Sequence, residues 1–509
     1  MKILSIETSC DETAISILEA EGDFGDVTPN LKKSSTNFSK FWLQLWKKFS
    51  SYLDNFHIFS YVSHKIFGNY PKDFSKNGVE NPVKFKILAN NLISQIEIHK
   101  EYGGVFPALA KREHSKNLIP ILRKTLSESN LSHRSPTPVN QKGNEIKKIL
   151  EREPELLKLF MEYIPTIEIP DIEAIAVTQG PGLEPALWVG INFAKALSLV
   201  WDKPLIPVNH MEGHLLASLA IKNEKLKIKN SGGKINFPAI GLLISGGHTE
   251  LIYMSKFRSY EKIGQTRDDA VGEAFDKVAR MMDIPYPGGP EISKLAQTQR
   301  EKICRGATPT SVGVAPLQSD IVLPRPMLNT DDFDFSFSGL KTAVLYLIKN
   351  LKKELNKKSL DRHANAREDE RDSASSVTIA KQSSLQGTKQ SSEIKLPQEI
   401  KQEIALEFET AVVEILLKKT EKAIEKYGAK TLIIGGGVSA NSQIRQSFQS
   451  LGNRVSKLEV LMPEKEFSTD NAVMIGIAGY FEYIEQKKQG QLQTAIDLGE
   501  LRADGNLKL

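Results

Sequence analysis

Two histidines four residues apart are the first residues in this chain that could perform chemistry. His210 and His214 flank Met211, Glu212 and Gly213. On a helix, side chains at positions i and i+4 lie on one face with about 6 Å between their Cβ atoms, so both imidazoles could bind one metal ion. Such pairs also occur by chance on ordinary helices. Two imidazoles are too few for a tight metal site, so a carboxylate or substrate atoms would have to complete the ligand set.

The residues between the histidines argue against a zinc protease. In the His-Glu-x-x-His motif of those enzymes, the glutamate directly follows the first histidine and acts as general base. Here Met211 occupies that place, and Glu212 is rotated from it by about 100° around the helix. A metalloendopeptidase therefore remains an alternative, but the chain lacks the glutamate that would act as its general base.

The best candidate for the missing carboxylate lies far away in the sequence. Asp470 follows Ser468 and Thr469 at the predicted start of a C-terminal helix, where a side-chain oxygen can cap free amides. A second acid, Asp276, lies on a helix predicted over residues 268–282 and could reach hydroxyl groups of a ligand. The alternative for Asp276 is an ordinary solvated helix face.

Four turns indicate the elements that must position these residues. Residues 2–18 and 238–254 each read as two strands joined by a tight turn of small and polar residues. Turns at 180–182 and 435–437 each follow a buried strand and open a helix, and backbone N–H groups at such turns can bind a small anion. An ordinary α/β crossover has the same anatomy. Because the order hairpin, strand, glycine turn, helix occurs twice, the pattern predicts a duplicated, two-lobed α/β fold.

Composition sets broad limits on the class of protein. The 509 residues allow two or three domains, and a net charge of +5 permits a nucleic-acid partner without arguing for one. Cys10 and Cys304 form no C-x-x-C pair, which excludes a thiolate metal cage. The acidic N-terminus lacks the apolar core of a signal peptide, and no apolar run reaches about 18 residues. We expect a protein of the cytoplasm without a membrane span.

Several stretches look like surface insertions. The aromatic-rich segment at about 20–90 predicts amphipathic helices that pack on the body of the protein, with a membrane surface, a partner protein or RNA as alternatives. Polar insertions are predicted at about 132–165 and 296–325, with a terminating loop at 286–290 before the second. The Ser-, Lys- and Gln-rich stretch at about 356–396 predicts a loose or disordered loop, because it has too few apolar groups to offset the entropy of ordering.

Ten short motifs, in this order, resemble one family: the universal tRNA N6-adenosine threonylcarbamoyltransferases, formerly described as O-sialoglycoprotein endopeptidases. Together they span the chain apart from the insertions. The resemblance implies an actin- and Hsp70-like two-lobed ATPase fold (ASKHA) with the active site in its cleft. It places the N-terminal lobe at 1–209, the C-terminal lobe at 210–471, and a helix and tail at 472–509 that return to the first lobe. The motifs are IETSCDET, YGGVFPALA, TQGPGL, HMEGH, ISGGHTEL, DDAVGEAFDKVA, YPGGP, FSFSGLK, GGGVSAN and STDNAVMIG.

The resemblance also implies an activity and a set of site residues. The reaction would transfer the threonylcarbamoyl group from threonylcarbamoyl-AMP to N6 of adenosine 37 in tRNAs that read codons beginning with A. One divalent metal per subunit, iron by family precedent with zinc as the alternative, would be bound by His210, His214 and Asp470. Expected partners are tRNA, a non-catalytic paralogue and a small ATPase, while a separate enzyme makes the adenylate. The residues implied in binding threonylcarbamoyl-AMP are Ile244, Ser245, Gly246, Gly247, His248, Asp276, Gly289 and Asn441.

Chemistry fits this assignment and leaves two alternatives of other classes. The electrophile already has a good leaving group, so no Ser or Cys nucleophile is required, and the acceptor of the N6 proton is not identified. A small-molecule kinase of the same fold would not need the two-histidine helix. A non-catalytic scaffold would be expected to have lost metal ligands, whereas this chain keeps all three candidates.

Overall fold

The computed structural model describes residues 1–21, 83–137, 139–219, 235–306, 321–373, 395–493 and 501–509. The predicted amphipathic helices of the aromatic-rich segment fall almost entirely on residues 22–82, outside these ranges. Within the described ranges, no helix has an apolar stretch long enough to cross a bilayer.

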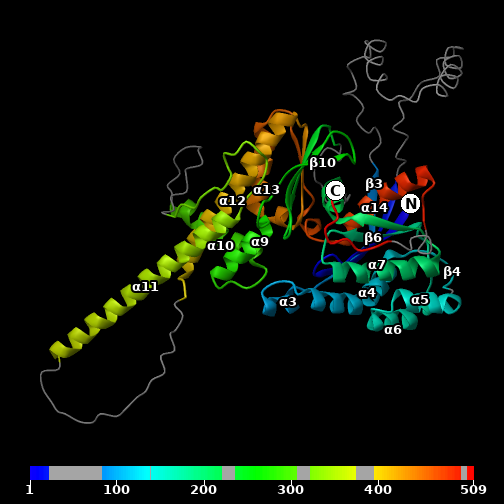
Figure 1. Ribbon diagram of the computed structural model, residues 1–509, viewed down its shortest axis with the longest axis horizontal. Coiled ribbons are helices and arrows are strands. Elements are labelled where there is room, and N and C mark those ends of the chain that lie inside the picture. Colours follow the sequence, from blue (N-terminus) through cyan, green and yellow to red (C-terminus); the bar gives the residue numbers. More distant parts are fainter. Residues whose placement is uncertain (22–82, 138, 220–234, 307–320, 374–394, 494–500) are drawn as a thin grey trace, which may run out of the picture. The chain divides into compact units, whose positions relative to one another are not determined.

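The N-terminal half is built on a five-stranded mixed sheet with the strand order β3-β2-β1-β6-β7 (Figure 1). The first three strands pair antiparallel, whereas β1, β6 and β7 run parallel. The core strands β1 and β6 are buried along nearly their whole length, as expected for strands covered on both faces. The strands are β1 (Lys2–Glu7), β2 (Glu12–Glu21), β3 (Lys84–Ser94), β6 (Ala174–Gly180) and β7 (Leu205–Asn209).

The second half repeats this connectivity. Its sheet has the order β10-β9-β8-β11-β12, with an antiparallel β8-β9-β10 meander followed by parallel β11 and β12. In each sheet the first strand of the half lies in the middle and the fourth strand lies beside it. The twofold order of turns in the sequence therefore corresponds to two sheets of equal connectivity. The strands are β8 (Ala239–Ile244), β9 (Thr249–Met254), β10 (Tyr260–Gln265), β11 (Thr431–Gly435) and β12 (Glu459–Leu461).

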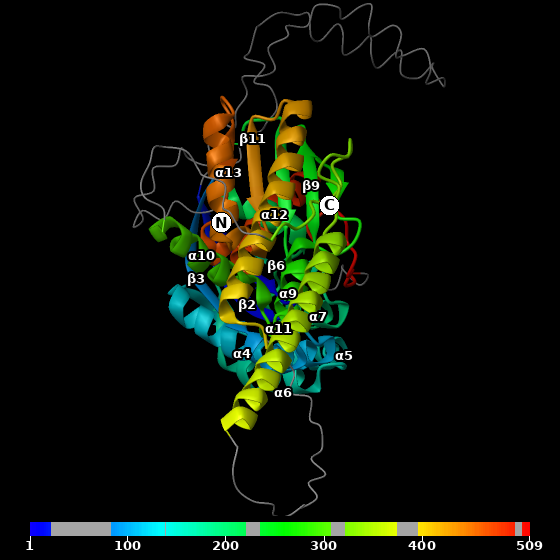
Figure 2. The same cartoon turned by 90° about the vertical axis from the view of Figure 1, so that its left-hand side faces the viewer.

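Helices cover both sheets. On one face of the N-terminal sheet, Leu4 and Ile6 join the core formed with α4 and α7; on the other face, Ser5 Oγ donates to the Ala472 carbonyl of α14 at 2.6 Å. In the second half, α12 and α13 lie beside β11 (Figure 2). The longer helices are α4 (Pro107–Ser129), α5 (Gly143–Ile149), α6 (Pro154–Tyr163), α7 (Glu184–Trp201), α8 (His210–Leu216), α9 (Val271–Met281), α10 (Gly288–Gly306), α11 (Ser338–Ser373), α12 (Gln398–Tyr427), α13 (Ser442–Arg454) and α14 (Ala472–Gln489). 

Two of the predicted polar insertions contain regular structure. The stretch 132–165 holds α5 and α6, and Ile146, Leu156 and Phe160 are fully buried in the core of the N-terminal half. The stretch 296–325 begins inside α10, which starts at Gly288 within the residues expected to form a terminating loop. Its apolar positions Ile292 and Ala296 are buried in the core of the second half, which explains why the helix is retained.

The expected loose loop from about residue 356 is wrong as far as Ser373, because α11 continues to that residue. The composition of this stretch is low in apolar groups but rich in Ala, Lys, Arg and Glu, which have high intrinsic helix propensity. Scarcity of apolar residues excludes a buried helix, but it does not exclude a helix with solvent around it.

Candidate metal centre and substrate site

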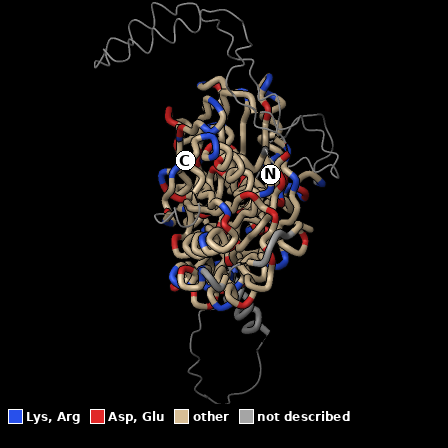
Figure 3. Tube along the Cα trace, turned by 90° about the vertical axis from the view of Figure 1, so that its right-hand side faces the viewer, with Lys and Arg blue, Asp and Glu red and all other residues tan. Residues whose placement is uncertain are grey.

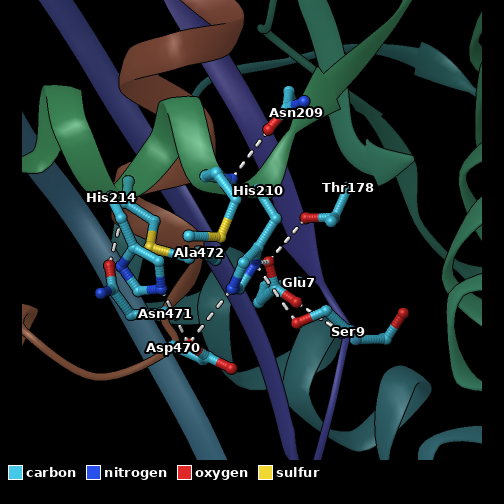
Figure 4. Close-up of polar contacts among 12 residues, drawn as sticks. Glu7, Ser9, Thr178, Asn209, His210, His214, Asp470, Asn471 and Ala472 are labelled. Carbon is cyan, nitrogen blue, oxygen red and sulfur yellow. Dashed lines mark hydrogen bonds and ion pairs between the residues drawn. The ribbon is translucent and has the colours of Figure 1, made fainter. Parts of the chain in front are cut away.

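Three side chains from two distant segments converge as the sequence predicted. His210 and His214 project from α8 toward Asp470, which lies just before α14 (Figure 4). The Nε2 atoms of His210 and His214 lie 3.4 and 3.1 Å from the same carboxylate oxygen of Asp470. One ligand atom from each residue falls within 4.8 Å of the others. The arrangement offers two nitrogens and one oxygen to a single cation, which is a common set for Zn²⁺ or Fe²⁺.

Asparagine N-caps determine where α8 and α14 begin, and so where the three candidate ligands lie. The Asn209 side chain accepts from the backbone N–H groups of Met211 and Glu212 at 2.9 and 3.2 Å, so α8 begins at His210. The Asn471 side chain likewise accepts from a backbone N–H of α14, which places Asp470 one residue outside the helix. The N-cap of α14 is therefore Asn471, rather than a residue of the predicted Ser-Thr-Asp start.

A second carboxylate, from Glu7 at the end of β1, orients the first histidine. Its Oε2 atom lies 3.1 Å from Nδ1 of His210 and also accepts from the Thr178 hydroxyl at 2.6 Å. An ionised carboxylate can only accept, so Nδ1 of His210 carries a proton and Nε2 is directed to Asp470. Histidine ligands of metals are commonly held by a carboxylate in this way. Glu7 was not predicted as a site residue, although it lies in the IETSCDET motif at the end of a predicted strand.

The Asp470 carboxylate and the His210 side chain form a tight ion pair, and His214 lies beside them. Burial opposes charge on His210, but the carboxylates of Asp470 and Glu7 outweigh it and raise the pKa of His210 well above its ordinary value. Burial likewise opposes the ionised form of Asp470, yet His210 and His214 hold the pKa of that carboxyl below its usual range. Burial lowers the pKa of His214. A bound cation would replace the proton of His210 in balancing the carboxylates, so metal binding would release a proton.

The chemistry of the donor set supports the fit to a cation. Nε2 of each of two imidazoles lies against one shared carboxylate oxygen, a set that matches the preference of zinc and iron. His210, His214 and Asp470 therefore fit the metal that the sequence led us to expect.

The glycine turn after β11 packs directly against α8. A Cβ at Gly435 would lie 2.4 Å from the backbone oxygen of His214, and one at Gly436, where φ is +91°, would lie 2.5 Å from the Ile244 oxygen. Only glycine allows these approaches. The turn after β11 and the end of β8 are thus brought beside α8.

The turn Ser245–His248 leaves backbone open to a ligand. It is closed by a hydrogen bond from the Ser245 amide to the His248 carbonyl at 2.9 Å, and the His248 amide donates to Ser245 Oγ at 3.1 Å. Gly246 and Gly247 are exposed, and a Cβ at either would have no neighbour within 4 Å. The space beside these two glycines is therefore open, and their part in binding a ligand stays a prediction.

The remaining candidate substrate residues form a second group, held by α9, α10 and α13. Oδ1 of Asp276 accepts from the amides of Gly288 and Gly289 at 2.7 and 3.3 Å, and burial raises the pKa of this carboxyl. Asp276 is therefore a cap of α10 rather than part of a solvated helix face. Asn441 caps α13 through Oδ1, while its Nδ2 donates to Ser293 Oγ at 3.2 Å and Glu409 Oε1 at 2.6 Å. Both polar atoms of Asn441 are thus bound within the protein.

A second buried histidine lies near the site. His114, on α4, is fully buried beneath the turn that follows β1. Its Nε2 atom donates to the Cys10 carbonyl at 3.0 Å, and its Nδ1 lies 2.8 Å from the Thr13 hydroxyl. The helical pattern around His114 gives no signal for this contact, since its partners lie 101 and 104 residues away.

Comparisons with known proteins agree with these motifs. A family model described as tRNA N6-adenosine threonylcarbamoyltransferase matches residues 86–138 and 154–477. A protein of that name from Staphylococcus aureus (strain MSSA476) is 34% identical over 435 residues, which cover 85% of this chain and 94% of the relative. One from Bacillus cereus is also 34% identical and covers 83% and 91%. A crystal structure of full-length HypF in its phosphate- and nucleotide-bound form has a TM-score of 0.33 at 13% identity, covering 65% of this chain and 41% of that one, a likeness too weak to assign a fold. The extent and identity of the sequence matches place this chain in the tRNA N6-adenosine threonylcarbamoyltransferase family.

Proposed function

We propose that this protein transfers the threonylcarbamoyl group from threonylcarbamoyl-AMP to N6 of adenosine 37 in tRNAs that read codons beginning with A. Membership of the family supports the reaction class. The observation that carries the proposal is the convergence of His210, His214 and Asp470, and the open turn that contains Gly246 and Gly247 adds support. A cation and free amides next to one another suit a substrate that joins a phosphate to a carbonyl group.

In the reaction, the N6 amine attacks the carbonyl carbon, a new C–N bond forms, the bond from that carbon to the phosphate oxygen breaks to release AMP, and N6 gives up one proton to solvent. The exposed amides of Gly246 and Gly247 would hold the phosphate, and Asp276 and Gly289 would lie against the nucleoside. A metal held by His210, His214 and Asp470, iron or zinc, would supply positive charge for the phosphate or carbonyl oxygens. Glu7 would keep His210 oriented. No nucleophilic Ser or Cys takes part, because the adenylate is already activated.

The lobe boundaries and partners belong to the same proposal. We assign 1–209 to an N-terminal lobe, 210–471 to a C-terminal lobe and 472–509 to a segment returning to the first, in an actin- and Hsp70-like fold. The Lys195 ammonium donates to the Leu501 carbonyl at 2.8 Å, which supports the return of the tail. The protein would act in the cytoplasm on tRNA, together with a non-catalytic paralogue and a small ATPase. In Figure 3, basic and acidic residues are interspersed along the described trace, so RNA binding would depend on local contacts.

The protease alternative meets a geometric obstacle. Glu212, the only acid between the two histidines, is bound by Arg258 at 2.7 Å and by the Tyr260 hydroxyl at 2.8 Å. Both carboxylate oxygens of Glu212 accept hydrogen bonds from these side chains, so neither is free to bind a water molecule as a general base must.

The test supplies threonylcarbamoyl-AMP, unmodified tRNA and the two expected partners, and measures modified adenosine by mass spectrometry. The wild type is expected to form it, and Asp470→Ala is expected to lose at least 100-fold in rate, since removal of a ligand empties the metal centre. Asp331→Ala removes an exposed carboxylate elsewhere and serves as the matched control. No modified adenosine with the wild type, or full activity in Asp470→Ala, would overturn the proposal.

A further inference from the structure

One arginine lies behind the metal helix and binds three carboxylates. Arg258 contacts Glu212 through Nε at 2.7 Å, Glu482 through one terminal nitrogen at 2.5 Å and Glu485 through the other at 2.7 Å. The Tyr260 hydroxyl donates to the same Glu212 oxygen at 2.8 Å. These five residues are called the Arg258 cluster below.

The Arg258 cluster joins the two segments that carry the candidate metal ligands. Glu212 stands on α8 midway between His210 and His214, on the opposite side of the helix because it is rotated by about 200° from His210. Glu482 and Glu485 belong to α14, the helix that begins two residues after Asp470. The contacts of Arg258 therefore link α8 to α14 on the side of α8 away from His210 and His214.

The ion pairs of Arg258 are strengthened because the side chains are largely buried. The Arg258 and Glu212 side chains are only 16% and 9% exposed. Burial opposes the charge of Arg258, but Glu212 and Glu482 outweigh it and raise the pKa of the guanidinium. Without Arg258, the carboxylates of Glu212 and Glu482 would face one another with no cation between them, and like charges would separate the helices.

The surroundings of the Arg258 cluster are mostly polar. The cluster lines a cavity of about 650 Å³ whose other walls are mostly polar, including Asn209, Gln486 and Lys508. Asn209, the cap of α8, also donates to the Lys508 carbonyl at 3.0 Å. On the side that faces this cavity, α8 is held by hydrogen bonds and ion pairs, whereas Met211 and Leu215 of the same helix join an apolar core.

We propose that Arg258 and Tyr260 are positioning residues, which fix the spacing of His210 and His214 relative to Asp470 by tying α8 to α14. The inference rests on the proposed metal centre and concerns how that centre is shaped. Residues that act behind metal ligands typically change metal affinity 10- to 100-fold when they are removed.

The test measures metal binding directly on the full chain. Zn²⁺ affinity is determined by competition with a chromophoric chelator, and the visible spectrum of bound Co²⁺ reports the ligand geometry. Arg258→Gln is expected to weaken Zn²⁺ binding by about 10- to 100-fold and to change the Co²⁺ spectrum. Arg258→Lys is expected to fall between it and the wild type, because an ammonium cannot bridge three carboxylates in the planar geometry of a guanidinium.

A matched control separates positioning from general stability. Arg325 is similarly buried, at 18% exposure, and also bridges two carboxylates, those of Glu407 and Glu414. Arg325→Gln is expected to keep the Zn²⁺ affinity within twofold. If Arg258→Gln does not fold, Tyr260→Phe removes one hydrogen bond to Glu212 and is expected to weaken Zn²⁺ binding by several-fold.

The possible failures are distinguishable. Equal Zn²⁺ affinity and an unchanged Co²⁺ spectrum in a folded Arg258→Gln variant would overturn the positioning role alone, as would an equal loss in Arg325→Gln. If Arg258→Gln is unfolded, wild-type Zn²⁺ affinity in Tyr260→Phe would do the same. A wild type that binds neither Zn²⁺ nor Co²⁺ would overturn the metal centre and this inference with it.

Discussion

The buried imidazole of His114 predicts a stability that depends on acid in a defined range. Burial lowers the pKa of His114 to about 4, and this effect exceeds the opposing influence of the Cys10 carbonyl and nearby acids. In the unfolded chain the same group takes up a proton near pH 6.5. Between these values the unfolded state binds more protons, so the free energy of unfolding falls as the pH falls.

The magnitude follows from the two pKa values. A difference of about 2.5 pH units at about 1.4 kcal/mol per unit gives about 3 kcal/mol of stability. This contribution is fully present above pH 6.5 and is lost by pH 4. Because His114 supports the turn after β1, through the Cys10 carbonyl, the loss would loosen the segment that contains Ser9 and precedes Asp11.

The measurement compares the wild type with His114→Gln by urea unfolding at several pH values from 7.5 to 4. Glutamine keeps one donor and one acceptor for the contacts with Cys10 and Thr13, but it does not titrate in this range. The carboxylates common to both proteins cancel in the difference. The advantage of the wild type should shrink by about 3 kcal/mol on acidification. A difference that stays constant within about 1 kcal/mol across this range would refute the assignment of His114 as a neutral buried group.

Two further substitutions test contacts that shape the site. Gly435→Ala is expected to lower the free energy of unfolding by about 1–3 kcal/mol and to weaken Zn²⁺ binding, because the new Cβ meets the backbone of His214; Gly143→Ala, which meets nothing within 4 Å, should change stability by less than about 0.5 kcal/mol. Equal unfolding curves for both variants would contradict this. Glu409→Leu is expected to cost about 3–5 kcal/mol in chemical denaturation, because Arg300 loses a fully buried partner at 2.6 Å; a cost under about 1 kcal/mol would show that the pair is not a net contributor.

Local patterns in the sequence predicted much of the architecture. Alternation and turn residues predicted the hairpins of β1–β2 and β8–β9, and the strand, turn and helix around Gly435 were predicted in the right order. The metal trio was also predicted, because a spacing of four on a helix fixes His210 and His214 on one face. Asp470 was named as the candidate carboxylate from its place at a predicted helix start, although nothing local links it to α8.

Contacts over long sequence separations explain what was missed. Glu7 approaches His210 across 203 positions, and Arg258 approaches Glu482 across 224. Neither residue belongs to a motif whose periodicity reveals a partner. The helical continuation of α11 to Ser373 was missed for a different reason. The prediction of a loose loop rested on low apolar content, which bears on whether a helix is buried and not on whether it forms.

Asparagine caps explain how distant segments can form so tight a site. Asn209 caps α8, Asn441 caps α13 and Asn471 caps α14. Two of the caps adjoin the metal ligands: His210 follows Asn209 directly, and Asp470 directly precedes Asn471. A cap fixes the first residue of a helix. The asparagine next to each ligand therefore determines the position from which the ligand side chain projects. The long-range packing then has only to bring helix ends together, and both the glycine turn after β11 and the Arg258 cluster contact α8.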